Sequence, residues 1–228
     1  YATWAALQNG NYTHGPYLSP FYSPEIWGAS PHAWFGPKPT WWPSVVPFSP
    51  ALIILPIPAL FRFTCYYYRG AYYKAFWADP PACAVGEPRD SYLGENSFPL
   101  IMQNVHRYGL LLSFILLVFL WYDAYLAFWF DDGSGGTEFG IGVGSVVMLT
   151  NVVLLSGYTI GCHSMRHVVG GMLDRLSRAP IRKLAYDCSS ACNRGHMNWA
   201  WCSLFSVALT DVYIRLCASG VLTDVRML

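Results

Sequence analysis

The sequence predicts an all-α membrane protein, a bundle of four transmembrane helices with an irregular aromatic and Pro-rich N-terminal cap. Hydrophobic residues make up 54% of the 228 positions and charged residues only 12%, whereas an average soluble domain is roughly 25% charged. Trp, Tyr and Phe supply 17% of the chain, and such residues collect at membrane–water interfaces. The net charge of +1 gives no basis for nucleic-acid binding.

The N-terminal part of the chain, residues 1–46, is expected to form the cap. It is rich in Pro, Trp, Tyr and Gly and shows no helical or strand period. Because aromatic side chains favour the interface, we expect this segment to lie there, on the periplasmic side. Residues 47–228 are then expected to form the transmembrane domain.

Four apolar segments make up this domain, and each is long enough for the roughly 20 residues that a spanning helix needs. A helix is expected in each, since every backbone polar group inside a bilayer must find its partner within the segment. Pro56 and Pro58 are expected to kink the first segment, and Leu110–Trp121 makes the second nearly all apolar. Asp131–Gly136 forms a tight loop after it. The predicted spans cover residues 47–77, 99–130, 138–173 and 187–220.

The distribution of Arg and Lys predicts the orientation of the bundle. The opposite side of the membrane holds only Lys38 and Arg226, together with acidic residues of the 131–138 loop. Basic loops remain in the cytoplasm, so the ends of the first and third spans and the starts of the second and fourth are expected to be cytoplasmic. The basic residues on that side are Arg69, Lys74, Arg89, Arg107, Arg166, Arg175, Arg178, Arg182, Lys183 and Arg194.

Cys and His residues gather at the same cytoplasmic ends. Ionisable residues are costly inside a bilayer, so their presence there is a functional hypothesis by default. On the third span, His163 and His167 are four residues apart and share one helix face, while Cys162 lies roughly 100° away on another. All four spans contribute to the group, which consists of Cys65, Cys83, His106, Cys162, His163, His167 and His196.

This set of side chains suits a redox centre. Thiolates are the usual ligands of iron–sulfur clusters, and replacing some of them by His raises the potential of a [2Fe–2S] cluster. Two His residues on different helices would instead suit a b-type haem. For Cys65, Cys83 and Cys162 we favour metal binding, whereas His106 and His196 could simply hydrogen-bond backbone or lipid headgroups.

Other polar and thiol side chains have simpler interpretations. Small buried thiols are common in apolar helices, so the remaining cysteines, Cys188, Cys192, Cys202 and Cys217, are interpreted as structural. Asp211 and Arg215 are four apart and are expected to pair within one helix. Asp123 is expected to be protonated or paired across helices. A proton path through these carboxylates is the alternative to a buried structural pair.

Five stretches, which cover most of the chain after residue 60, resemble one family. With these residues, the chain resembles the membrane-anchor (cytochrome b-like) subunit of succinate dehydrogenase, or succinate:quinone oxidoreductase, in its actinobacterial form. The stretches are Phe63–Arg89 (FTCYYYRGAYYKAFWADPPACAVGEPR), Gln103–Tyr108 (QNVHRY), Gly161–Gly171 (GCHSMRHVVGG), Gly195–Trp201 (GHMNWAW) and Leu209–Leu228 (LTDVYIRLCASGVLTDVRML).

The resemblance implies partners and a role in the bacterial cell membrane. It implies a flavoprotein subunit that oxidises succinate and an iron–sulfur subunit docked on the cytoplasmic face, within a complex that could form a higher oligomer. The anchor would pass electrons to a membrane quinone and carry out no succinate chemistry itself, so it holds no catalytic residue for that step. Diheme relatives need His near both membrane faces. The outer halves of these helices contain none, so at most one haem fits.

From the residues and the resemblance together we expect a [2Fe–2S] cluster held by three thiols and one imidazole. The thiols are those of Cys65, Cys83 and Cys162. The quinone is expected near an imidazole that donates to a carbonyl oxygen, beside two cationic side chains: His106, Arg107 and Arg69. The imidazole of the cluster is expected from one of three positions, His163, His167 and His196.

Three alternatives remain open at this point. The first is a cytochrome anchor of the same complex with a single bis-His haem b. The second is a transporter, which needs polar residues along a path such as Asp123 to His106. Against it, no helix is interrupted near the middle of the membrane, as transporter helices often are. The third is a purely structural anchor without a cofactor.

Overall fold

The computed structural model describes residues 1–65, 68, 101–173 and 175–228. Two predicted site residues, Arg69 and Cys83, lie outside the described residues. The chain forms two compact units, one made of Tyr1–Leu55 with Ile115–Leu228 and the other of Pro56–Phe114. The described part is mostly helical, with a few short strands. The prediction of a helical membrane protein is confirmed at that level.

Three described helices are long and apolar enough to cross a membrane, over Asn104–Leu126, Val143–Ile160 and His196–Ala218. They correspond to α5 (Ile101–Leu126), α6 (Val143–Ile160) and α9 (His196–Ala218). The first predicted span, over 47–77, is described only through α2 (Ala51–Ile54) and α3 (Pro56–Thr64), which together are shorter than a span. Three spans are therefore found where four were predicted.

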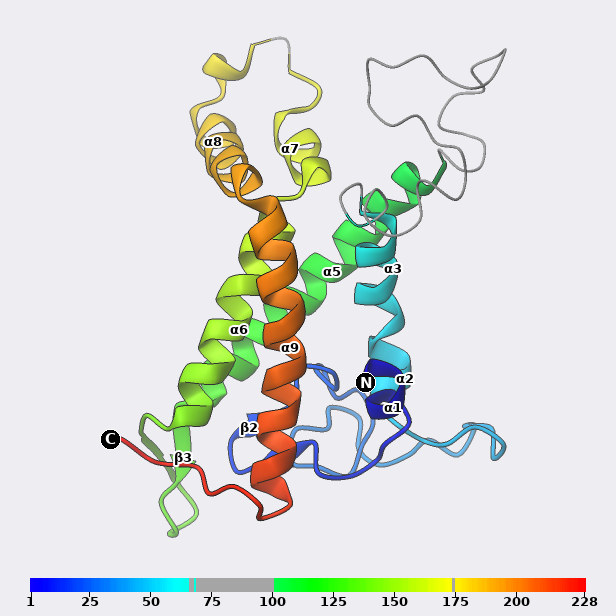
Figure 1. Cartoon of the computed structure of the whole chain (residues 1–228), viewed down its shortest axis with the longest axis vertical. Helices are drawn as coiled ribbons and strands as arrows, with labels where there is room; N and C mark the ends of the chain where they lie inside the picture. Colours follow the sequence, from blue (N-terminus) through cyan, green and yellow to red (C-terminus); the bar gives the residue numbers. More distant parts are fainter. Residues whose placement is uncertain (66–67, 69–100, 174) are drawn as a thin grey trace. The chain divides into compact units, whose positions relative to one another are not determined.

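In the first unit, α6 and α9 run antiparallel and side by side (Figure 1). Met148 of α6 and Ile214 of α9 are buried in one apolar cluster near one end of the pair. Toward the other end, the ring of Trp199 occupies the place that a side chain at Gly157 would need, because a Cβ there would lie 2.5 Å from the ring. Glycine is thus required at this position for α9 to approach α6 so closely.

The C-terminal half of α5 also packs against α6. Leu117 and Ala124 are buried against Val152, and the indole nitrogen of Trp121 donates to Ser156 Oγ at 3.0 Å. After α5 the chain forms an antiparallel hairpin of β3 (Trp129–Asp131) and β4 (Thr137–Phe139). The predicted loop over Asp131–Gly136 is the turn of this hairpin, so the predicted second span, 99–130, ends a few residues too late.

The predicted third and fourth spans also differ in their limits. A continuous helix was expected over 138–173, but α6 ends at Ile160 and α7 covers His163–Gly170. The fourth span was expected over 187–220, but Gly195 separates α8 (Pro180–Arg194) from α9, and a 3₁₀ turn, η3 (Leu176–Arg178), precedes α8. The breaks occur at Gly161 and Gly195, and a Cβ at Gly161 would lie 3.0 Å from the backbone of Cys192 in α8.

The N-terminal segment is largely irregular, as predicted, but it has its own core. It contains α1 (Ala2–Ala6) and a two-stranded pairing of β1 (Thr13–His14) with β2 (Tyr17–Leu18). The segment lies at the end of the α6–α9 pair that also carries the C-terminus (Figure 1). Val207 and Ala208 of α9 pack against its buried residues, which are Ala5, Tyr12, Leu18, Phe21, Tyr22 and Ala51.

Asp211 of α9 is the main polar attachment of this segment. Its carboxylate is fully buried and accepts hydrogen bonds from the hydroxyls of Tyr1 and Ser19. Arg215 Nε donates to the same carboxylate at 2.8 Å, which confirms the predicted pair. The Arg215 guanidinium also donates to Tyr22 Oη at 2.7 Å and to the Gly10 carbonyl at 3.0 Å.

A second carboxylate is held in the same way. Asp123 of α5 is buried and accepts a hydrogen bond from Ser23 Oγ of the N-terminal segment. Its described partner is therefore the cap rather than another helix. Both membrane-helix carboxylates contribute to holding residues 1–46 against the bundle.

Replacing Asp211 by Ala is expected to destabilise the protein strongly. The change leaves the Arg215 guanidinium without its carboxylate and the hydroxyls of Tyr1 and Ser19 without their acceptor. Removing one partner of a buried ion pair costs about 3–5 kcal/mol. The free energy of unfolding in detergent, from denaturant titration, is the measurement.

Lys183→Ala is the matched control for this experiment. Lys183 Nζ pairs with Asp187 at 2.5 Å, also four residues apart on a helix, but both side chains are about half exposed. Exposed pairs contribute at most about 1 kcal/mol. An equal loss of stability in the two variants would contradict the role given to Asp211.

Candidate functional site

The candidate site begins at the junction of α6 and α7, where Cys162 lies. Two side chains of α8 hold this junction, since Ser189 Oγ donates to the Ile160 carbonyl and Asn193 Nδ2 to the Gly161 carbonyl, each at 2.7 Å. The last carbonyls of a helix have no partner within it, so these two donors satisfy the end of α6. The chain can therefore turn out of the helix here while both carbonyl groups keep a hydrogen-bond donor.

Cys162 consequently has an extended backbone, with φ −66° and ψ 141°, and is the N-cap residue of α7. Its side chain is 2% exposed and does not cap the helix. The thiol is therefore buried at the N-terminus of α7, which is the positive end of that helix's dipole. The sequence placed Cys162 on another face of the same helix as His163 and His167, but Cys162 lies before α7, outside the helix.

The position of α7 is fixed by α8. Arg166 Nη2 donates to Tyr186 Oη at 2.9 Å. Arg182 donates to the carbonyls of Val169 and Gly171, at 2.8 and 2.6 Å. These acceptors are orphan carbonyls at the C-terminus of α7, where a cation is also favoured by the helix dipole.

The two imidazoles of α7 meet each other. His163 and His167 are both exposed, and their Nε2 atoms lie 2.9 Å apart. Their ring centroids are separated by 4.5 Å, with the rings nearly perpendicular. The prediction that these two residues share a helix face is confirmed.

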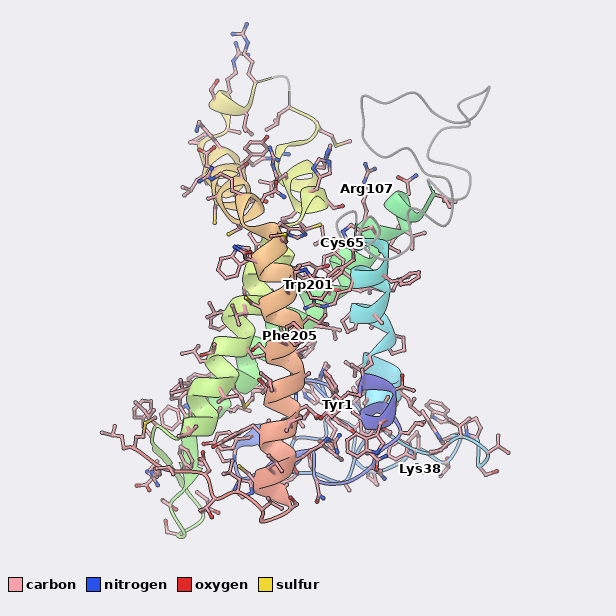
Figure 2. The ribbon with its side chains drawn as sticks, in the orientation of Figure 1. Tyr1, Lys38, Cys65, Arg107, Trp201 and Phe205 are labelled. Carbon is pink, nitrogen blue, oxygen red and sulfur yellow. The ribbon has the colours of Figure 1, made fainter. Side chains whose placement is uncertain are left out.

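His196 lies at the first residue of α9, half-buried against α6. Its ring stacks on that of Tyr158, with centroids 5.1 Å apart and an interplanar angle of 15°. This contact places an imidazole where α6 and α9 meet. On the next turns of α9, Trp201 and Phe205 stack on each other one turn apart (Figure 2).

In the second unit, Cys65 directly follows α3, and His106 and Arg107 lie on α5 (Figure 2). Cys65 is 2% and His106 4% exposed, whereas Arg107 is exposed. The His106 ring stacks on Phe61 with centroids 4.6 Å apart and an interplanar angle of 6°. A thiol and an imidazole are thus both buried in this unit.

The tautomer of neutral His106 follows from its contact with Thr64. Thr64 Oγ1 lies 3.0 Å from His106 Nδ1, and the Thr64 hydroxyl donates to the Leu60 carbonyl at 2.7 Å. A hydroxyl has a single proton to donate, so Thr64 Oγ1 accepts from Nδ1–H. We therefore assign the proton of neutral His106 to Nδ1.

The predicted metal ligands are divided between the two units. Cys65 belongs to one, whereas Cys162, His163, His167 and His196 belong to the other. Among the described residues, no group of three His, Cys, Asp or Glu side chains is placed to hold one metal ion. The ligand set remains a prediction.

Two features reduce the reactivity of the Cys192 thiol on α8. Burial raises the pKa of the Cys192 thiol, and the neighbouring Cys188 raises it further. A raised pKa favours the protonated thiol, which agrees with the structural role expected for Cys192.

The sequence reasoning missed several residues that position the site. Ser189 and Asn193 hold the end of α6, Arg182 holds the end of α7, and Thr64 orients His106. Ser189 and Asn193 are four apart, which places both on one helix face. That spacing was the available signal, but small polar residues on a helix normally indicate only a solvated face.

The sequence profile of the actinobacterial succinate dehydrogenase subunit SdhC matches residues 1–220 of the chain. Among solved structures, a chain of the Mycobacterium smegmatis Sdh1 complex in the apo form matches with a TM-score of 0.81 and 43% sequence identity. The match covers 100% of this chain and 85% of that one. No curated protein sequence matches the chain.

The tautomer assignment predicts the effect of two substitutions at Thr64. Thr64→Val removes the acceptor of the His106 Nδ1–H, and a buried donor left without a partner costs about 1–3 kcal/mol. Thr64→Ser keeps the hydroxyl and is expected to retain most of the stability. Denaturant unfolding in detergent measures both, and a Thr64→Val protein as stable as Thr64→Ser would contradict the assignment.

Proposed function

The chain belongs to the SdhC subunits of actinobacterial succinate dehydrogenase, and we propose that in this enzyme it carries electrons from a docked iron–sulfur subunit to a membrane quinone. The family membership makes it a subunit of an enzyme complex, and its three candidate spanning helices fit a membrane anchor. The sequence contains no flavin or dicarboxylate motif. Succinate oxidation is therefore assigned to a flavoprotein partner.

We further propose that the bundle has a fourth span and a cytoplasmic Cys/His end. The apolar segment Ala51–Thr64 is too short to cross a membrane, and residues beyond Cys65 would complete it. Around α8, the side chains of Arg175, Arg178, Lys183 and Arg194 are exposed. The positive-inside rule then assigns the α7–α8 end of the first unit to the cytoplasm, where the soluble subunits would dock.

Cys162 is the observation that carries the proposed redox role. It is buried, lies outside both neighbouring helices and is the N-cap residue of α7. These features suit a thiolate ligand, and we propose Cys65, Cys83 and Cys162 with one imidazole as the ligands of a [2Fe–2S] cluster. When bound, such a cluster supplies one-electron transfer between the docked subunit and the quinone.

His106 and Arg107, with Arg69 outside the described residues, are proposed to bind the quinone. His106 Nδ1 lies 3.0 Å from Thr64 Oγ1, and a protonated imidazole can donate a proton to a carbonyl oxygen of the quinone. Stacking on Phe61 fixes the plane of the ring, and cationic side chains nearby favour negative charge on the quinone oxygens.

The iron content of the purified complex tests the cluster. Cys162→Ser is expected to contain about two irons and two acid-labile sulfides fewer per SdhC chain than the wild type, because one thiolate ligand is lost. Cys202→Ser is the matched control, since Cys202 is exposed on α9 and should leave both counts unchanged. Unchanged iron in Cys162→Ser would refute the ligand assignment.

A single haem b is the competing cofactor, and it needs two imidazoles on different helices. His163 and His167 are directed at each other on one helix, which makes them less suited to the two faces of a haem. Reduced-minus-oxidised optical spectra of the same preparation decide between the two. A sharp haem α band that disappears in His196→Ala would favour the cytochrome.

A transporter is the alternative from another functional class, and the polar contacts argue against it. Asp123, the carboxylate of the path considered for a transporter, accepts a hydrogen bond from Ser23 of the N-terminal segment, which fits a structural role. We expect proteoliposomes of the complex to show no solute flux without quinone turnover. Flux in the absence of quinone would support a transporter, and a complex with no iron in SdhC would support a purely structural anchor.

A further inference from the structure

Helix α8 presents an apolar face away from the protein. Ile181 is 83% and Leu184 72% exposed, and Cys188 is exposed as well. At about 100° per residue these three side chains share one face of the helix, which Ala185 and Ala191 extend. Contiguous apolar surface is rare on soluble monomers and marks contact with a partner or a membrane.

The side chains that hold α8 in place are polar and lie on another face. Arg182 and Tyr186 bond with α7. Ser189 and Asn193 donate to the carbonyls at the end of α6. Their spacing of four, three and four residues places all of them along one stripe. Because α8 packs against the protein through these hydrogen bonds, its apolar side chains are left on the outside.

A charged stripe borders the apolar face. Lys183, Asp187 and Arg194 lie within about 40° of one another around the helix, and all three are exposed. Lys and Arg can cover apolar surface with their stems while their charged ends remain at the polar boundary. Since α8 carries three cations and one carboxylate, it is suited to a negatively charged surface.

The connections of α8 place it at a membrane boundary. The helix lies at the end of the α6–α9 pair opposite the C-terminus (Figure 1). Two of its side chains bond with the end of α6, and only Gly195 separates it from α9. Both α6 and α9 are candidate spans, so the last turns of α8 lie where these spans meet water.

We propose that α8 is an interfacial helix, with the face of Ile181, Leu184 and Cys188 in the lipid and its cationic side chains at anionic headgroups. Amphipathic helices of this kind bury their apolar face roughly 5–10 Å into the boundary of headgroups and acyl chains. Lipid suits this face better than a protein partner does, because protein interfaces favour aromatic anchors and these side chains are aliphatic or small. The contact is independent of the proposed redox role, and only its cytoplasmic side rests on the orientation proposed above.

Photo-crosslinking from the helix itself tests the proposal. The purified complex carries Leu184→p-benzoylphenylalanine and is placed in nanodiscs of phosphatidylcholine with a minority of phosphatidylglycerol. Irradiation is expected to add the mass of one phospholipid to SdhC. The same substitution at Leu209, which is exposed on the spanning helix α9, is the positive control for lipid. At Asp187, on the charged stripe, a much lower yield of lipid adduct is expected.

The composition of these adducts tests the role of charge. The ratio of phosphatidylglycerol to phosphatidylcholine should exceed that of the disc by roughly fivefold, the enrichment expected from one cation close to an anionic headgroup. Lys183→Ala is expected to lower this enrichment, whereas Lys183→Arg keeps the charge and should leave it unchanged. Adducts in the same proportion as the disc would overturn the headgroup contact.

Two results would overturn the lipid contact. An adduct from Leu184→p-benzoylphenylalanine to the iron–sulfur or flavoprotein subunit would assign this face to a protein partner. The absence of a lipid adduct there, in a preparation in which the Leu209 variant is crosslinked to lipid, would show that the face lies away from the bilayer. Neither result depends on the iron content of SdhC, so failure of the proposed redox role would be distinguished from failure of this contact.

Discussion

The last carbonyl groups of α6 need hydrogen-bond donors, and the way in which they obtain them determines the geometry of the candidate site. Ser189 and Asn193 of α8 supply these donors at the junction with α7. Because of these bonds, the backbone leaves the helix at Gly161, and Cys162 becomes the N-cap of a new helix instead of a residue within a long one. The buried position of Cys162 and the exposed position of the two α7 imidazoles both depend on this change of direction.

At the other end of the α6–α9 pair, buried polar side chains attach the N-terminal segment to the helices. Buried carboxylates on α5 and α9 are bonded to hydroxyls of the N-terminal segment. An ionisable group inside a membrane is a functional candidate by default, yet here the contacts are structural. The His residues of α7 and α9 lie at the end of the first unit where α6 stops and α9 begins.

Much of the fold could be predicted because it depends on local composition. Apolar length predicted the segments that contain α5, α6 and α9, and the spacing of four residues predicted both the Asp211–Arg215 pair and the shared face of His163 and His167. The resemblance to the succinate dehydrogenase anchor is confirmed over residues 1–220. Helix ends were predicted less well, because a break such as that at Gly161 depends on donors from a helix almost thirty residues away in the sequence.

The sequence by itself determined the membrane class, the family and the types of side chain available for chemistry, since these follow from composition and from residues close together in the chain. Only the tertiary structure decided what each side chain does. Thr64 contacts His106 Nδ1 and also donates to the Leu60 carbonyl, and on this basis we assign the proton of neutral His106 to Nδ1. His163 and His167 share a face because they are four residues apart, but the position of α7 itself depends on its contacts with α8. Such roles depend on contacts between elements distant in the sequence, which no local pattern records.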